Sequence, residues 1–197
     1  EQNLTLDLSP TVGALFELAA VVDQCKACSL HRTRRHTVFG AGSPSADCMF
    51  VGEAPGAEED RRGVPFVGRA GQLLNEMILA LGVERDQTYI ANVLKCRPPD
   101  NRDPQGEEVH SCETYLHQQI QLIEPRLIIA LGRFAAQSLL KSSLPIGKLR
   151  GVRHSYEPFG IPLVATYHPA YLLRSPLEKR KVWSDLRLAK DVLSKNR

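Results

Sequence analysis

The chain has few cysteines, and it lacks any long hydrophobic stretch. Only 5 of its 197 residues are cysteine, and no apolar run reaches the roughly 20 residues that cross a bilayer. No basic region followed by an apolar one stands at the start, so no signal peptide is predicted. We therefore expect an intracellular, cytoplasmic protein without membrane contact, whose cysteines are free or metal-bound rather than paired in disulfides.

Internal repeats and low-complexity segments are also lacking. A length of 197 residues then predicts one domain over 1–197, with residues 1–10 as a loose N-terminal segment. The composition, 43% hydrophobic and 24% charged, is that of an ordinary globular protein. The net charge of +3 permits nucleic-acid binding without requiring it. We expect a monomer.

Short apolar runs alternate with segments of helical periodicity. Strands are expected over 47–53, 88–94, 126–131 and 162–167, and helices over 11–24, 70–81, 107–124, 133–140 and 177–194. Pro, Asn, Asp and Gly mark residues 97–106 as a loop. This order predicts an α/β fold: a three-layer α/β/α sandwich around a central four-stranded parallel sheet.

Polar or glycine-rich segments follow three of the expected strands. They are residues 52–56, Asn92, and His168 with Pro169. Ligands of parallel α/β folds bind at the carboxyl ends of the strands. The sequence therefore predicts a site where these three strand ends meet.

The first of these segments begins a stretch with five glycines in residues 52–71. Glycines let the backbone approach a ligand closely. The stretch lacks Gly-Lys-Ser/Thr, and Glu58, Glu59 and Asp60 would repel a polyphosphate. A phosphate-cradling loop is therefore disfavoured, although a nucleotide-binding domain and a plain structural loop stay open as alternatives.

Four of the five cysteines are spaced like the ligands of one metal site. Cys25 and Cys28 form a C-x-x-C, and Cys96 and Cys112 follow in the middle of the chain. Four thiolates suit structural zinc or an iron–sulfur cluster. Zinc sites more often use two C-x-x-C pairs, which makes zinc the second choice. Cys48 lies in an expected strand and is predicted to be a small buried apolar residue.

Several motifs together resemble one known family. The strings GEAPG-x-x-E-D, PFVGRAGQLLN, NVLKCRPP and HPAYLLR occur in order, and they resemble family 4 uracil-DNA glycosylases, which carry a [4Fe–4S] cluster. The resemblance covers about residues 25–193. It implies a structural [4Fe–4S] cluster on Cys25, Cys28, Cys96 and Cys112.

The resemblance also implies the activity. The protein would act in base excision repair, flipping uracil out of single- or double-stranded DNA and hydrolysing its N-glycosidic bond. The products would be free uracil and an abasic site, without a lyase step. The implied uracil-binding residues are Glu53, Ala54, Pro55, Glu59, Phe66, Asn92 and His168.

The resemblance implies chemical roles for most of these residues. Phe66 would stack on the ring, and the Asn92 amide would accept from uracil N3–H and donate to O4, a pattern that cytosine reverses. Backbone N–H groups near Glu53 and Ala54 would hold O2. Glu59 would exclude the methyl group of thymine.

The implied catalytic residues are Glu53, Asn92 and His168. A hydrogen bond from His168 to uracil O2 would strengthen as negative charge develops there. Glu53 would position the attacking water or steady the sugar cation.

Three residues of the last motif are implied to contact DNA. Leu172 or Leu173 would wedge into the gap left by the flipped base, and Arg174 would contact phosphate. A metal-stabilised module that binds uracil or single strands without cutting is the alternative, because its pocket would look alike.

Overall fold

Six strands form one sheet in the computed structural model of the protein, which describes residues 9–195. The strands are β1 (Ala41–Gly42), β2 (Cys48–Gly52), β3 (Tyr89–Asn92), β4 (Leu127–Leu131), β5 (Arg153–Tyr156) and β6 (Ile161–Thr166). Their order across the sheet is β1-β3-β2-β4-β6-β5. The inner four strands are mutually parallel, and β1 and β5 pair antiparallel at the two edges.

The four expected strands are thus confirmed, but the expected total of four is wrong. The sheet is mixed because its two edge strands pair antiparallel, and these two strands were not predicted. β1 has only two residues, and β5 reads Arg-His-Ser-Tyr, which contains no apolar run. Neither edge strand carries the pattern by which a buried strand is found in a sequence.

Eight α-helices lie within residues 9–195. They are α1 (Pro10–Asp23), α2 (Ala57–Arg62), α3 (Arg69–Leu81), α4 (Gly106–Ile123), α5 (Arg133–Leu140), α6 (Ile146–Leu149), α7 (Pro169–Arg174) and α8 (Lys179–Lys195). The five helices expected from periodicity are confirmed within two residues at each end. The three that were not predicted, α2, α6 and α7, have four to six residues each, too few to show a period.

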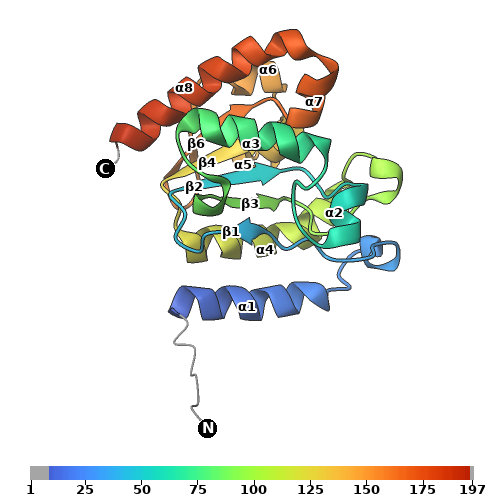
Figure 1. The fold of residues 1–197 in the computed structure, drawn as a ribbon. Coiled ribbons are helices and arrows are strands. Elements are labelled where there is room, and N and C mark those ends of the chain that lie inside the picture. The colour runs from blue at the N-terminus through green and yellow to red at the C-terminus, as the bar shows by residue number, and fades with distance from the viewer. Residues whose placement is uncertain (1–8, 196–197) are drawn as a thin grey trace.

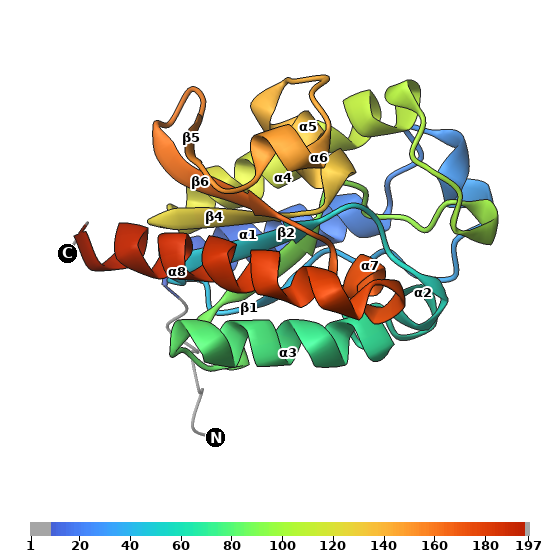
Figure 2. The same ribbon diagram turned by 90° about the horizontal axis from the view of Figure 1, so that it is seen from above.

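Helices cover both faces of the sheet. Figure 2 shows α3 and α8 on one side of the strands and α4, α5 and α6 on the other. Alternate residues of β2 serve the two faces: Met49 and Val51 join the core under α4 and α5, and Cys48 and Phe50 join the core under α3 and α8. Cys48 is 2% exposed, which confirms its prediction as a buried residue.

The N-terminal helix packs on the outside of one helical layer. α1 lies along α4 (Figure 1), with Leu15 in the core beneath it. Ser9 caps α1 by accepting from the N–H of Val12, and Pro10 follows at the first helical position. Residues 1–8 of the expected loose segment lie outside the described residues, whereas Ser9 and Pro10 belong to this helix start. No helix of the described part of the chain is long and apolar enough to cross a membrane.

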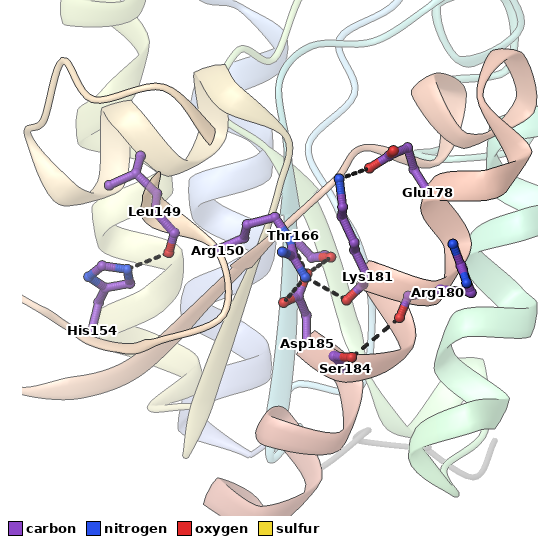
Figure 3. A network of polar contacts seen from close by, with 9 residues as sticks. All are labelled: Leu149, Arg150, His154, Thr166, Glu178, Arg180, Lys181, Ser184 and Asp185. Carbon is purple, nitrogen blue, oxygen red and sulfur yellow. Dashed lines mark hydrogen bonds and ion pairs between the residues drawn. The ribbon is translucent and has the colours of Figure 1, made fainter. Parts of the chain in front are cut away.

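A buried ion pair fastens α8 to the end of β6. Asp185 accepts hydrogen bonds from Arg150 Nε at 3.0 Å, Arg150 Nη2 at 2.8 Å and Thr166 Oγ1 at 2.7 Å (Figure 3). Arg150 Nη2 also donates to the carbonyl of Lys181 at 2.7 Å. Burial raises the pKa of Asp185, although Thr166 and Arg150 work against that rise. The carboxylate is therefore held in place by its partners rather than by water.

Removal of Asp185 is expected to destabilise the fold. Asp185→Ala leaves the Arg150 guanidinium mostly buried without its counter-ion, at a cost of about 3 kcal/mol in the free energy of unfolding. Urea unfolding followed by circular dichroism measures this change. Asp191→Ala, an exposed aspartate of the same helix, is the control and should change stability by less than about 0.5 kcal/mol. Equal effects of the two substitutions would show that the ion pair does not hold α8.

Candidate active site

The strand ends converge on one pocket, as the sequence predicted. Residues that follow β2, the last residue of β3, and the residue two positions after β6 line a cavity of about 460 Å³. β2 points toward the side of the molecule where α2 and α7 lie (Figure 1). The lining residues are Glu53, Ala54, Pro55, Gly56, Glu59, Phe66, Ala70, Asn92, Pro98, Asn101, Arg102, Asp103, His168, Ala170, Tyr171 and Arg174. All seven residues expected to bind uracil are among them.

The backbone of Phe66 is strained, and it fixes the position of the ring. Its φ is +52°, which is uncommon for a residue with a bulky side chain. Gly71 makes this turn possible, since a Cβ there would lie 1.8 Å from the carbonyl oxygen of Phe66. Glu59 Oε1 completes the support by accepting from the N–H groups of Val67 at 2.9 Å and Gly68 at 3.0 Å. Strain of this kind persists where the surroundings fix it, and here it presents a ring to the pocket.

Asn92 offers an acceptor without a partner. The residue is 1% exposed, and its Oδ1 is buried with no hydrogen bond among the described residues. Gly52 leaves room for it: a Cβ at Gly52 would lie 2.4 Å from Asn92 Oδ1 and 2.7 Å from Phe66 Cζ. Buried polar atoms are nearly always paired, so an unpaired one lining a cavity indicates a ligand that donates.

The His168 ring is oriented by the helix that follows it. Its Nδ1 accepts from the N–H of Ala170 at 3.1 Å and so caps the start of α7. A neutral ring whose Nδ1 accepts must carry its proton on Nε2, so the other nitrogen is a donor. Burial and nearby Arg174 lower the pKa of His168 to about 4, with Glu59 opposing the shift. The neutral donor form therefore holds throughout the physiological range.

Glu53 directly follows β2, and the pKa of its carboxyl group is raised. Burial, and then the negative charge of Asp103, raise the pKa of Glu53 to about 7, against the lowering effect of Arg133. Arg133 in turn lies 3.4 Å from Asp103 in an ion pair between its Nη2 and Oδ2. A carboxyl group with a pKa near neutrality in a pocket is a feature of general bases and acids.

One wall of the pocket was missed by the sequence analysis. Asn101, Arg102 and Asp103 belong to the segment that was expected only as a loop. Arg102 fixes it with a bidentate pair to Glu108, at 2.5 and 3.0 Å. The sequence carries a signal for the start of α4, because Gln105 and Glu108 form a capping box there. No sequence signal indicates that the loop folds against the pocket.

The two leucines expected to contact DNA differ in exposure. Leu172 is 1% exposed and packs in the core between the sheet, α3 and α8. Leu173 is 42% exposed on α7, and Arg174, the last residue of that helix, lines the pocket. Of the two candidates for a wedge, only Leu173 is therefore available at the surface.

Comparison with known proteins gives the family. Residues 39–187 match the model of the Uracil DNA glycosylase superfamily. The chain is 41% identical over 188 residues to the type-4 uracil-DNA glycosylase of Archaeoglobus fulgidus, covering 92% of this chain and 94% of that protein. The chain belongs to the type-4 uracil-DNA glycosylases. The enzymes of the same description from Pyrobaculum aerophilum and Thermotoga maritima are 44% and 42% identical, over 87% and 88% of the chain and 91% and 92% of their own lengths. The resemblance found in the motifs is thereby confirmed.

The four cysteines of this family member line one small cavity beside the pocket. Cys25, Cys28, Cys96 and Cys112 share it with apolar and aromatic neighbours and with Arg34 and Lys95. Three of the sulfur atoms already accept N–H hydrogen bonds: Cys25 from Ala27, Cys96 from Arg34 at 3.2 Å, and Cys112 from the backbone of Lys95 at 3.3 Å. In the part of the chain that the structure describes, no three such side chains are grouped tightly enough to hold a metal ion as they stand. None of the five cysteines is in a disulfide.

Proposed function

We propose that the pocket holds a uracil flipped out of DNA and that the N-glycosidic bond is hydrolysed there. Family membership supports the activity, a DNA-repair hydrolase acting on N-glycosyl bonds. The observation that supports the site most strongly is that one pocket contains both a buried acceptor without a partner, Asn92 Oδ1, and a fixed donor, His168 Nε2. The products are free uracil and an abasic site.

The pocket selects uracil by its edge and by its shape. Asn92 Oδ1 accepts from N3–H and the amide nitrogen donates to O4, whereas cytosine presents neither group in that arrangement. A polar group left unpaired in a buried site is costly, so cytosine is rejected. The ring stacks on Phe66, and Glu59, in the wall of the same pocket, excludes a methyl group at C5.

Catalysis uses a neutral histidine as a hydrogen-bond donor. As the bond to N1 breaks, charge develops at uracil O2, and Nε2–H of His168 binds O2 more strongly in the transition state than in the ground state. Backbone N–H groups of Glu53 and Ala54 supply further donors at this strand end. The carboxylate form of Glu53 positions the attacking water or steadies the positive charge on the sugar.

DNA is held beside the pocket by α7. Flipping a base costs a few kcal/mol, and the exposed Leu173 offsets part of it by filling the gap in the stack. Arg174 contacts phosphate. No lysine is among the pocket-lining residues that the structure describes, which fits a monofunctional enzyme without a Schiff-base step. We further propose that one domain over residues 1–197 acts as a cytoplasmic monomer on single- or double-stranded DNA.

We assign the cysteine cavity to a structural [4Fe–4S] cluster, with zinc as the alternative. Four thiols in a largely apolar cavity, with N–H groups already directed at three of the sulfurs, suit cluster ligation. When bound, the group supplies thermodynamic stability by cross-linking distant segments, because its binding energy is folding energy. None of the four cysteines lines the uracil pocket.

The activity is tested with a labelled oligonucleotide that contains one deoxyuridine, single-stranded or paired with G or A. Strand cleavage is expected only after alkali. His168→Ala and Asn92→Ala are each expected to lower kcat/KM by on the order of a hundredfold or more, because each removes a transition-state or recognition contact. Folded protein that binds the oligonucleotide without excising uracil would support the alternative, a binding module.

The reaction is expected to depend on pH through Glu53. A raised pKa means that Glu53 is protonated at acidic pH, so kcat/KM should rise about tenfold per unit up to pH near 7 and then level. His168 stays neutral above its pKa of about 4 and adds no limb there. Glu53→Gln should give a low, flat profile, whereas Glu58→Gln, an exposed carboxylate of α2, should keep the limb. An unchanged limb in Glu53→Gln would assign the titration to another group.

The metal is tested by composition. Purified protein should contain iron and inorganic sulfide in equal amounts and absorb visible light, whereas zinc without sulfide would favour the alternative. Cys96→Ala should lose the absorbance and lower the melting temperature, because a ligand of the cross-link is removed. Cys48→Ala, outside the cavity, should keep the absorbance.

A further inference from the structure

A lysine is fully buried between the uracil pocket and the cysteine cavity. Lys95 is 1% exposed, and its Nζ donates to the backbone carbonyl of Asn92 at 2.9 Å and to Gln119 Oε1 at 2.6 Å. It borders the cysteine cavity and does not line the uracil pocket. Lys95 has no role in the proposed hydrolysis of the N-glycosidic bond.

Gln119 is itself held at a fixed place. It is fully buried on α4, and its Nε2 donates to the Phe39 carbonyl at 3.0 Å and to the Tyr89 hydroxyl at 3.1 Å. Lys95, Gln119 and Tyr89 therefore form a closed polar network that joins both ends of β3 to the helix packed on one face of the sheet. Each hydrogen bond limits the movement of the next member, so the position of Nζ is determined by the core.

The network ends on the residue that faces the base. Asn92 is the last residue of β3, and its peptide carbonyl accepts a hydrogen bond from Nζ. Without this hydrogen bond the peptide after Asn92 is less firmly held, and a shift of about 1 Å at the Asn92 Cα would carry Oδ1 with it. Misplacement of that size is enough to weaken binding and catalysis.

The burial of this amine is costly for the fold. A lysine removed from water with only neutral hydrogen-bond partners is less favourable than a methionine of similar length. Packing alone gives no reason for a lysine here. The thiolates of the proposed cluster would favour a nearby cation, but the hydrogen bonds of the amine go to the Asn92 carbonyl and to Gln119.

We propose that Lys95 is a positioning residue that orients Asn92 for the recognition of uracil. The inference rests on the proposed role of Asn92. Gln119 supports the same function by fixing the amine, and either protonation state of Nζ can donate the required hydrogen bond.

A double-mutant cycle tests this role. Lys95→Met keeps the length of the side chain and removes the donor. It should lower kcat/KM by on the order of a hundredfold and weaken product inhibition by free uracil. In an Asn92→Ala background the same substitution should have no further effect, because its action passes through Asn92. Gln119→Leu should act in the same direction with a smaller loss, and Gln118→Leu, the neighbouring half-buried residue, should be silent.

The outcomes separate this role from two others. Lys95→Met that keeps its iron and its melting temperature but loses uracil affinity supports positioning. Loss of iron or of the fold, restored together with activity by reconstitution, would overturn it, because Lys95 would then serve only the cysteine site. Additive losses in the cycle would also overturn it. Wild-type protein that excises no uracil would refute the proposed function itself. That failure shows in the wild-type assay alone, so it is distinct from a failure of the positioning role.

Discussion

The register between β2 and β3 is the constraint on which the site depends. Gly52 pairs with Asn92, and beyond the strands Val93 and Leu94 continue the ladder by donating to the carbonyls of Gly52 and Glu53. A slip of one residue would turn Asn92 to the opposite face of the sheet. The pairing also places a glycine, which has no Cβ, opposite the Asn92 amide and against the Phe66 ring. The buried acceptor, the aromatic face and the carboxylate thus come together as consequences of one alignment.

Burial then sets the charge of the pocket. It lowers the pKa of His168 and raises that of Glu53, so both groups shift toward their neutral forms. For the histidine this favours a donor that carries no positive charge of its own before the reaction begins. For the glutamate it places the change of charge near neutral pH, where Asp103 and Arg133 oppose each other's influence. The same physical effect therefore gives the two groups the forms that their proposed roles require.

The sequence was informative where structure is local and where strands are long enough to show a pattern. Four strands and five helices followed from periodicity, and their alternation predicted which loops would meet at one edge. The turn at Phe66 could not be predicted, because its positive φ depends on Gly71 and on Glu59, both more than four residues away. The fold of residues 101–103 against the pocket depends on tertiary contacts with α4 and α5. Leu172 and Leu173 are adjacent and chemically identical, so only the packing of α7 decides which one is buried.

The short segment from Asn92 to Asp103 connects the two sites of this enzyme. It begins at the amide proposed to read uracil, passes through Lys95 and Cys96, and returns to the pocket at Asn101. Loops of polar residues ordinarily have low local stability. Here Arg34 donates to Cys96 and to carbonyls near the end of α1, and Val38 donates to the carbonyl of Lys95. The proposed cluster, with Cys96 as a ligand, would hold the middle of the segment, so that both of its ends keep their positions in the pocket. Under this proposal, a hydrolase that transfers no electrons depends on four thiolates for the geometry of its binding site.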